Sequence, residues 1–149
     1  MSTQTNKEVV RRLNLEFIQG RKLEVGDEIL SDRFVNHTPS PGLSAGKDGV
    51  RAFFEIMWHA FPDLSVEIFD QIAEENAVTT RKAFHGTHQG DFMGIPATGK
   101  RVQIDVTDII RLENGQFTDH WAVVDQVGLM QQLGVIPAQS IPAPYIPAP

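Results

Sequence analysis

The chain has 149 residues, a length that fits one domain with a core and room for one ligand cavity. Hydrophobic residues make up 41%, and the net charge of −6 argues against binding to nucleic acid, which needs clustered Lys and Arg. No cysteine is present, which excludes disulfides, thiolate metal sites and a cysteine nucleophile. The polar start and the lack of a long apolar run predict a cytoplasmic protein without a signal peptide or membrane span.

The first half of the chain is predicted to be mainly helical. Apolar residues at helical spacing, stopped by Gly20 and Pro62, define its helices. In chain order we predict helices over 7–19 and 23–30, a strand over 33–37, and a helix over 47–60. Two prolines at 39 and 41 end the strand in a loop at a sheet edge.

The second half of the chain changes to a period of two, which is typical of strands. The predicted strands cover 64–73, 77–88, 101–112 and 117–126, and a short helix follows over 129–133. Asn114-Gly115 is a strong signal for a two-residue hairpin. Helices followed by a strand meander predict an α+β fold with helices on one face of a curved antiparallel sheet.

The end of the chain repeats Ile-Pro-Ala every five residues. Such a segment favours extended, polyproline-like structure. We therefore predict one domain over 1–135 and a Pro-rich tail over 136–149, which is either a loose or strapped tail or a docking segment for a partner.

The hairpin at Asn114-Gly115 sets an expected register between its two strands. Counting outward from the turn places Asp108 opposite Trp121, with Asp119 and Asp125 on the same, mostly apolar face. Carboxylates on a buried face have raised pKa values unless they are paired, so these aspartates are candidate acids or bases. The alternatives are that they lie at the wet ends of the sheet or pair with an arginine such as Arg81. A β-bulge would exchange the two faces.

The same register places His120 on the polar face, exposed to solvent or at an interface. His37 precedes the Pro-rich loop and is either a general base at a pocket mouth or a loop cap. For His88 in the Gly-rich loop, a hydrogen bond that orders the loop competes with a role in the site. Phe54 and Trp58 belong to a stripe that is core packing first and pocket wall second. No metal-binding or phosphate-binding motif is found.

Several segments together resemble the SnoaL-like polyketide and ester cyclases. They are Gly86-Thr87-His88-Gln89-Gly90, Gly94-Ile95-Pro96-Ala97-Thr98-Gly99-Lys100, Asn114-Gly115, Asp119-His120-Trp121-Ala122-Val123-Val124-Asp125 and Gln132-Leu133-Gly134. The similarity runs from about residue 7 to residue 135. It implies the ketosteroid isomerase and nuclear transport factor fold, a conical sheet with three N-terminal helices over its concave face, a deep pocket and a homodimer.

The resemblance also implies acid–base chemistry without a cofactor or a metal. His37 resembles the base position, Asp108 the oxyanion-stabilising position, and Asp119 an acidic position before His-Trp. Phe17 stands where the isomerases have a helical tyrosine. Trp121, Asp125, Phe17, Phe54, Trp58 and His88 are the expected substrate contacts.

The resulting expectation is an enzyme that enolises a small apolar carbonyl or ester compound and then closes a ring by an aldol step or reprotonates the enolate. A neutral Asp108 would donate a hydrogen bond to the enolate. Two alternatives remain open: a small-ligand-binding or dimerisation module without turnover, and an epoxide hydrolase that uses a carboxylate-activated water.

Overall fold

The computed structural model describes residues 2–137, so the predicted tail over 136–149 lies almost entirely outside the described residues. The α+β fold is confirmed, and every predicted helix and strand is found. The elements are α1 (Thr3–Arg12), η1 (Leu13–Gln19), α2 (Leu23–Ile29), β1 (Leu30–Asn36), α3 (Lys47–Ala60), β2 (Ser65–Glu74), β3 (Ala77–Thr87), β4 (Arg101–Glu113), β5 (Gln116–Val124) and α4 (Gln126–Leu133).

The first predicted helix is longer than expected and changes type. It begins at Thr3 because the Ser2 hydroxyl accepts a hydrogen bond from the Thr5 N–H, at 3.1 Å, as an N-cap. From Leu13 onward it continues as a π-helical segment, η1. π-Helical segments are rare, and they are often found at functional sites because they re-aim a side chain.

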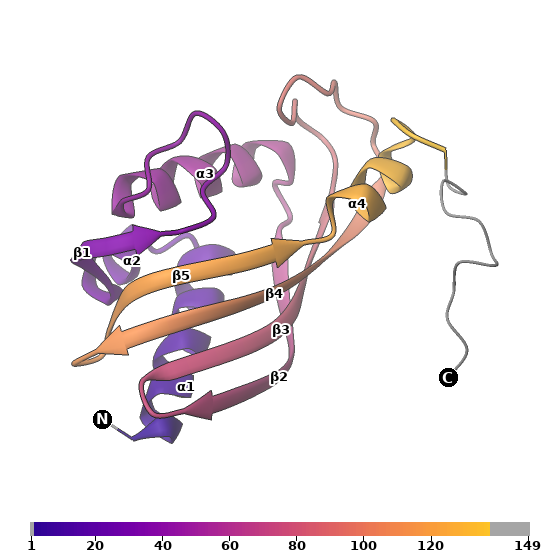
Figure 1. Ribbon diagram of the computed structural model, residues 1–149. Coiled ribbons are helices and arrows are strands. Elements are labelled where there is room, and N and C mark those ends of the chain that lie inside the picture. Colours follow the sequence, from indigo (N-terminus) through magenta and orange to yellow (C-terminus); the bar gives the residue numbers. More distant parts are fainter. Residues whose placement is uncertain (1, 138–149) are drawn as a thin grey trace, which may run out of the picture.

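The sheet has five strands in the order β1-β5-β4-β3-β2, and it is mixed. The strands β2 to β5 form the predicted antiparallel meander, while β1 pairs with β5 in parallel. Figure 1 shows the strongly twisted sheet, with α1, α2 and α3 on one side of it and α4 at the end of β5. The helices therefore cover the concave face, as the resemblance implied.

The hairpin between β4 and β5 has the predicted turn but not the predicted register. Asn114 and Gly115 both have positive φ angles, 51° and 78°, which the two-residue turn requires. Glu113 pairs with Gln116 and Leu112 pairs with Phe117, but Arg111 then pairs with Asp119. Thr118 is thus an extra residue in β5, a β-bulge.

The bulge exchanges the faces of β5 beyond Phe117. Asp108 lies opposite Ala122, and Trp121 lies opposite Ile109. The prediction that Asp119 and Trp121 share a cavity with Asp108 is therefore wrong. His120, expected on the polar face, lies on the concave face instead, because it pairs with the buried Ile110.

The concave face of the sheet and the inner sides of the helices form the core. Along β4, every second residue from Val102 to Leu112 is buried and the residues between them are exposed. The helices contribute aromatic rings to the same layer, such as Phe17 and Phe54, whose centroids lie 5.8 Å apart. Burial of such large side chains is the main stabilising contribution to a domain of this size.

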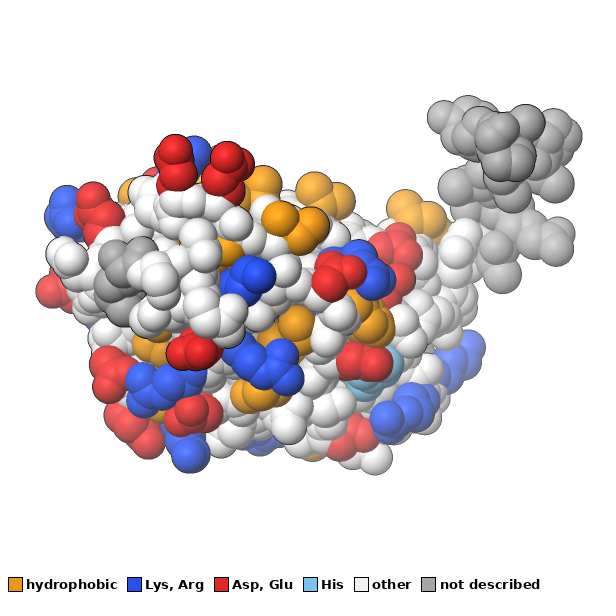
Figure 2. Space-filling model, turned by 90° about the horizontal axis from the view of Figure 1, so that it is seen from below, with side chains coloured by type: hydrophobic (Ala, Val, Ile, Leu, Met, Phe, Trp, Pro, Cys, Tyr) orange, Lys and Arg blue, Asp and Glu red, His pale blue; other side chains and the backbone are white. Residues whose placement is uncertain are grey.

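The surface carries charges of both signs. On the face shown in Figure 2, acidic and basic side chains lie next to one another rather than in separate areas. Among residues 2–137, no helix has both the length and the apolar character that a membrane crossing requires.

Candidate active site

A belt of polar side chains crosses the otherwise apolar concave face. Its buried members come from β3, β4 and η1: Thr80, Lys82, Asp108 and Asn14. Thr80 lies opposite Asp108 in the β3–β4 ladder. Burying polar and charged groups costs free energy, so a belt of this kind is a candidate for function rather than for stability.

The centre of the belt is a buried ion pair. The Lys82 Nζ lies 3.0 Å from the Asp108 Oδ2, and both side chains are about 5% exposed or less. Lys82 also donates a hydrogen bond to the Asn14 Oδ1 at 2.7 Å, and the Asn14 Nδ2 donates to the Val10 carbonyl at 2.9 Å. The ammonium group is therefore held in one position from two sides.

This pairing decides the charge of Asp108. Burial alone raises the pKa of Asp108, but the Lys82 ammonium and the His120 ring outweigh burial and hold the pKa below its ordinary value. Asp108 is a carboxylate at neutral pH. The expectation of a neutral Asp108 that donates a hydrogen bond to an enolate is therefore contradicted, because Lys82 supplies a counter-charge.

His120 joins the belt from β5, and its tautomer follows from its neighbours. The His120 Nδ1 lies 2.9 Å from the Asn36 Oδ1, which also accepts a hydrogen bond from the Thr38 backbone N–H at 3.0 Å. Because a backbone N–H can only donate, the shared Asn36 atom is an oxygen, and the His120 Nδ1 carries the proton. In the neutral ring, the Nε2 then presents a lone pair.

The Nε2 of His120 faces the carboxylate. The distance from the Nε2 to the Asp108 Oδ2 is 3.7 Å, too long for a direct hydrogen bond. The other oxygen of Asp108, Oδ1, is buried and has no hydrogen-bond partner among the described residues. The His120 side chain is 22% exposed, so the belt becomes accessible at His120. Such an arrangement can accept a proton at Nε2 and stabilise the resulting imidazolium with a carboxylate.

A second His–Asp pair lies on the convex face. The His37 Nε2 lies 2.9 Å from the Asp119 Oδ2, and the His37 ring stacks on Trp121 with centroids 4.4 Å apart. The hydrogen bond from His37 lowers the pKa of Asp119. The structure thus brings three of the expected site residues together, but on the opposite side of the sheet from Asp108.

The expected aromatic contacts form part of the core between the helices and the sheet. Phe17 and Phe54 are buried, and Phe54 packs edge-on against Phe84 of β3 at 6.1 Å. Trp58 is half-buried, and its indole N–H donates to the Ile18 carbonyl at 2.7 Å. These rings pack in the same layer between helices and sheet as the polar belt. Their role as a pocket wall stays a prediction.

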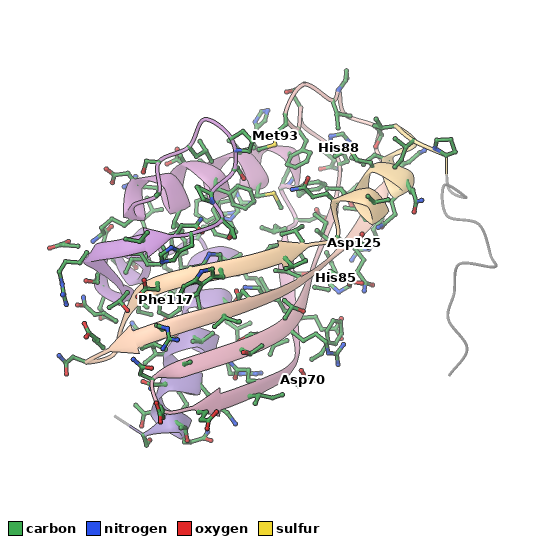
Figure 3. The ribbon with its side chains drawn as sticks, viewed as in Figure 1. Asp70, His85, His88, Met93, Phe117 and Asp125 are labelled. Atoms are coloured by element: carbon green, nitrogen blue, oxygen red, sulfur yellow. The ribbon has the colours of Figure 1, made fainter. Side chains whose placement is uncertain are left out.

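The last two expected contacts have structural partners. His88 is fully buried at the base of the loop between β3 and β4, and its Nδ1 accepts a hydrogen bond from the Thr98 N–H at 3.2 Å. Asp125 is exposed and caps α4 by accepting from the Gly128 N–H at 2.9 Å. Figure 3 shows both near the α4 end of the sheet, far from Phe117.

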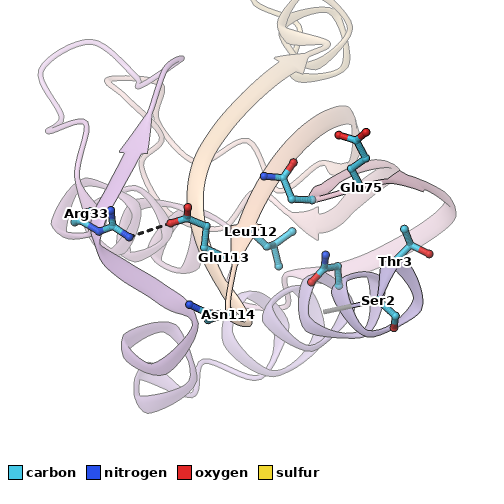
Figure 4. Close-up of a pocket in the computed structure, with 9 residues that line it drawn as sticks. Ser2, Thr3, Arg33, Glu75, Leu112, Glu113 and Asn114 are labelled. Atoms are coloured by element: carbon cyan, nitrogen blue, oxygen red, sulfur yellow. Dashed lines mark hydrogen bonds and ion pairs between the residues drawn. The ribbon is translucent and has the colours of Figure 1, made fainter.

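An open hollow of about 780 Å³ lies at the hairpin end of the sheet (Figure 4). Its lining residues are Ser2, Thr3, Asn6, Arg33, Glu75, Asn76, Leu112, Glu113 and Asn114, and the figure shows Arg33 paired with Glu113. None of the residues expected from the sequence lines this hollow, so it does not correspond to the expected pocket.

Lys82 and Asn14 were not predicted from the sequence. The neighbouring Arg81, predicted as a possible partner of the buried aspartates, points outward and pairs with Asp70 at 3.0 Å. The pairing of β3 with β4 places Lys82 opposite Val106 on the concave face. Two adjacent basic residues in a strand cannot share a face, and only the register decides which of them is buried.

Comparison with known proteins identifies the family. The sequence model of the SnoaL-like polyketide cyclases matches residues 8–133. The aklanonic acid methyl ester cyclase DnrD of Streptomyces peucetius is 29% identical over 140 residues, which cover 90% of this chain and 92% of DnrD.

Two solved structures have similar folds. TsrD from Streptomyces laurentii has a TM-score of 0.82 and 26% identity, with 91% of this chain and 99% of TsrD covered. AclR from Streptomyces galilaeus, which has been proposed to be a hydroxylase, has a TM-score of 0.82 and 27% identity, with 95% of this chain and 87% of AclR covered. With the family model matching most of the chain, these similarities lead to one assignment: the protein is an enzyme that belongs to the SnoaL-like polyketide cyclase family.

Proposed function

We propose that this enzyme closes a ring in a polyketide-like ester by an intramolecular aldol reaction, with His120 as the general base and without a cofactor. The observation that carries the proposal is the position of the His120 Nε2 on the concave face, 3.7 Å from the buried carboxylate of Asp108. The name of DnrD, a cyclase of aklanonic acid methyl ester, supports the substrate class.

The proposed reaction moves one proton and needs no oxidant or reductant. The neutral Nε2 of His120 removes a proton from the carbon α to a carbonyl, and Asp108 stabilises the imidazolium that forms. The enolate carbon attacks a second carbonyl of the same molecule, which forms the new carbon–carbon bond and an alkoxide. His120 then returns the proton to the alkoxide oxygen and becomes neutral again.

The surroundings of the belt suit an apolar substrate. Phe54 and Phe84 line the same layer of the molecule. The unpartnered Oδ1 of Asp108 is a hydrogen-bond acceptor that a substrate hydroxyl could satisfy. We therefore propose that a hydrophobic ring system packs against the aromatic side chains and directs its carbonyl groups toward His120.

The test is turnover of aklanonic acid methyl ester and of simpler diketo esters by the wild-type enzyme and by His120→Gln. Removal of a general base typically costs about 10²–10⁴ in rate. We expect the wild type to form a ring-closed product, which has the same mass as the substrate but a different chromatographic retention time and absorbance spectrum. In His120→Gln the rate of product formation should fall by this factor. The variant should keep the circular dichroism spectrum of the wild type, because the side chain is partly exposed.

Other results would select the alternatives. Tight binding of these esters without product would favour a ligand-binding module. Hydration of an epoxide probe that depends on Asp108 would favour an epoxide hydrolase. Full activity of His120→Gln would show that the base has been assigned to the wrong residue.

We also propose that the convex face mediates a homodimer. The bulge turns Trp121 and Val123 outward, and Val123 is 78% exposed. Ile109 of β4 and Val35 of β1 are exposed beside them, at 42% and 39%. An apolar group of this kind on a sheet face is typical of an interface. His120, which the predicted register placed on this face, lies on the concave face instead.

The dimer is tested by light scattering. The wild type should have twice the mass of the chain at tens of micromolar, roughly the range of weak association. Val123→Glu should produce a monomer, whereas the exposed Ile72→Glu on β2 should not. A monomeric wild type at these concentrations would disprove the dimer.

A further inference from the structure

The proposed base faces a problem of charge. A carboxylate only 3.7 Å from the His120 Nε2 favours the imidazolium form of the ring. An imidazolium has no lone pair, so it cannot remove a proton. A His–Asp contact of this geometry, taken alone, works against the form of the ring that acts as a base.

Lys82 lies where it can offset the negative charge of Asp108. Its Nζ contacts the same Asp108 oxygen, Oδ2, that faces the His120 Nε2. We infer that Lys82 is a positioning residue that neutralises the Asp108 carboxylate and thereby keeps His120 in the neutral form that acts as a base. This inference rests on the proposed role of His120 and names what controls it.

The ammonium cannot turn away from the carboxylate. It donates to the Asn14 Oδ1 at 2.7 Å, and Asn14 is itself 1% exposed and bonded to the Val10 carbonyl. The ring centroid of Phe84, which lies on the same strand, is 5.3 Å from the Lys82 Nζ. The π-helical segment η1 thus supplies the contact that holds Lys82 beside Asp108.

Among residues 2–137, the cation that shares the Asp108 oxygen with His120 is Lys82. The charged group that faces His120 from β4 is Asp108, and the polar group that faces it from β1 is the uncharged amide of Asn36. The His37 backbone N–H donates a hydrogen bond to the His120 carbonyl, while its ring pairs with Asp119, and the loop 38–46 contains no titratable side chain. Lys47 and Arg51 of α3 form ion pairs with other acidic residues, Asp32 and Glu55.

The first experiment compares pH–rate profiles. In Lys82→Met, the carboxylate loses its counter-charge and His120 keeps its proton to higher pH. We expect the acid limb of kcat/KM to move up by roughly one pH unit or more, with most activity regained at alkaline pH. In Asp108→Asn the limb should move in the opposite direction. Lys82→Arg should restore the wild-type profile, and Arg81→Met on the opposite face should not change it.

A role of Lys82 in stability alone gives a different result. It would lower the rate equally at all pH values without moving the acid limb, and this outcome would overturn the inference. If Lys82→Met does not fold, Lys82→Gln serves instead, because its amide can still donate to Asp108 without carrying charge. An Asp108→Asn profile identical to that of the wild type would also overturn the inference.

A second measurement does not depend on turnover. The ring carbon signals of 13C-labelled His120, assigned with His120→Gln, are followed by NMR from pH 5 to pH 9 without substrate. The titration midpoint should move up in Lys82→Met and down in Asp108→Asn. If the midpoints move but no ester is cyclised, the charge coupling stands and the proposed function fails. If turnover depends on His120 but the midpoints do not move, the proposed function stands and the inference fails.

Discussion

The two His–Asp pairs lie on opposite faces of the sheet, share only the strand β5, and differ in almost every physical respect. The convex pair, His37 and Asp119, has the shorter contact, 2.9 Å, with both side chains about one-third exposed. The concave pair, His120 and Asp108, is 3.7 Å apart, and its carboxylate is buried beside Lys82. The shorter contact is the one we expect to matter less.

The reason is the surrounding medium rather than the distance. Water screens the convex pair, and an exposed ion pair typically contributes about 0–1 kcal/mol. The concave pair interacts in a medium of lower dielectric constant, where each charge depends on its partners. A search for the best hydrogen bond would therefore select the wrong pair.

The largest expected difference between the pairs is in stability. Asp108→Ala leaves the Lys82 ammonium buried without a counter-charge, which typically costs about 3–5 kcal/mol. Asp119→Ala on the convex face should cost less than about 1 kcal/mol. Urea unfolding of both variants, monitored by circular dichroism, measures the difference.

The double variant Asp108→Leu/Lys82→Met is the control for this prediction. It replaces both charges with apolar groups of similar size, so it should recover much of the stability lost in Asp108→Ala. Equal destabilisation by Asp108→Ala and Asp119→Ala would contradict the distinction between the pairs.

The second-largest expected effect is the loss of stability at low pH. The pKa of Asp108 is lowered in the folded protein, so its stabilising contribution is complete above the ordinary carboxyl range and is lost as the pH falls through the lower folded-state value. The wild type should therefore lose stability as the pH falls below the ordinary carboxyl range of about 4. Asp108→Asn should flatten this part of the curve of unfolding free energy against pH.

Asp119→Asn serves as the comparison in the same titration. The pKa of Asp119 is lowered too, by the hydrogen bond from His37, but water screens the pair. Its variant should follow the wild-type curve closely. A flattening as large as that of Asp108→Asn would show that the convex pair contributes as much as the buried one.

The smallest expected effect is on catalysis by the convex pair. His37→Gln removes the contact to Asp119 but leaves the concave belt intact, so kcat/KM should change by less than about threefold, as for a surface substitution. The measurement is steady-state kinetics beside His120→Gln under identical conditions. A loss in His37→Gln as large as that in His120→Gln would return His37 to the catalytic machinery.

The sequence predicted the elements well because they depend on local signals. The turn at Asn114-Gly115 needs positive φ angles that these residues adopt easily, and the pair Glu113–Gln116 follows from it. The bulge at Thr118 could not be predicted, because it leaves no local signal in an otherwise regular strand. One extra residue was enough to reverse the assignment of Asp119 and His120.

The buried cation was unpredictable for a related reason. In β3, Ala83 and Phe84 are adjacent and both buried, so the alternation of apolar residues does not tell which of Arg81 and Lys82 faces inward. Asn14 lies in a helix whose type changes at Leu13, and helical spacing alone does not show which way such a segment directs its side chains. Both residues were found only from their tertiary contacts.

The bulge at Thr118 shifts the strand register by one residue between the turn and the half of the hairpin that carries His120. Deleting Thr118 would leave Asp119 opposite Arg111, so the two halves would still present the same residues to the same faces. Inserting a residue between Asp119 and His120 would instead turn the imidazole outward. Anyone who aligns this hairpin with another, or grafts it onto a new scaffold, should count positions from the bulge and not from the turn.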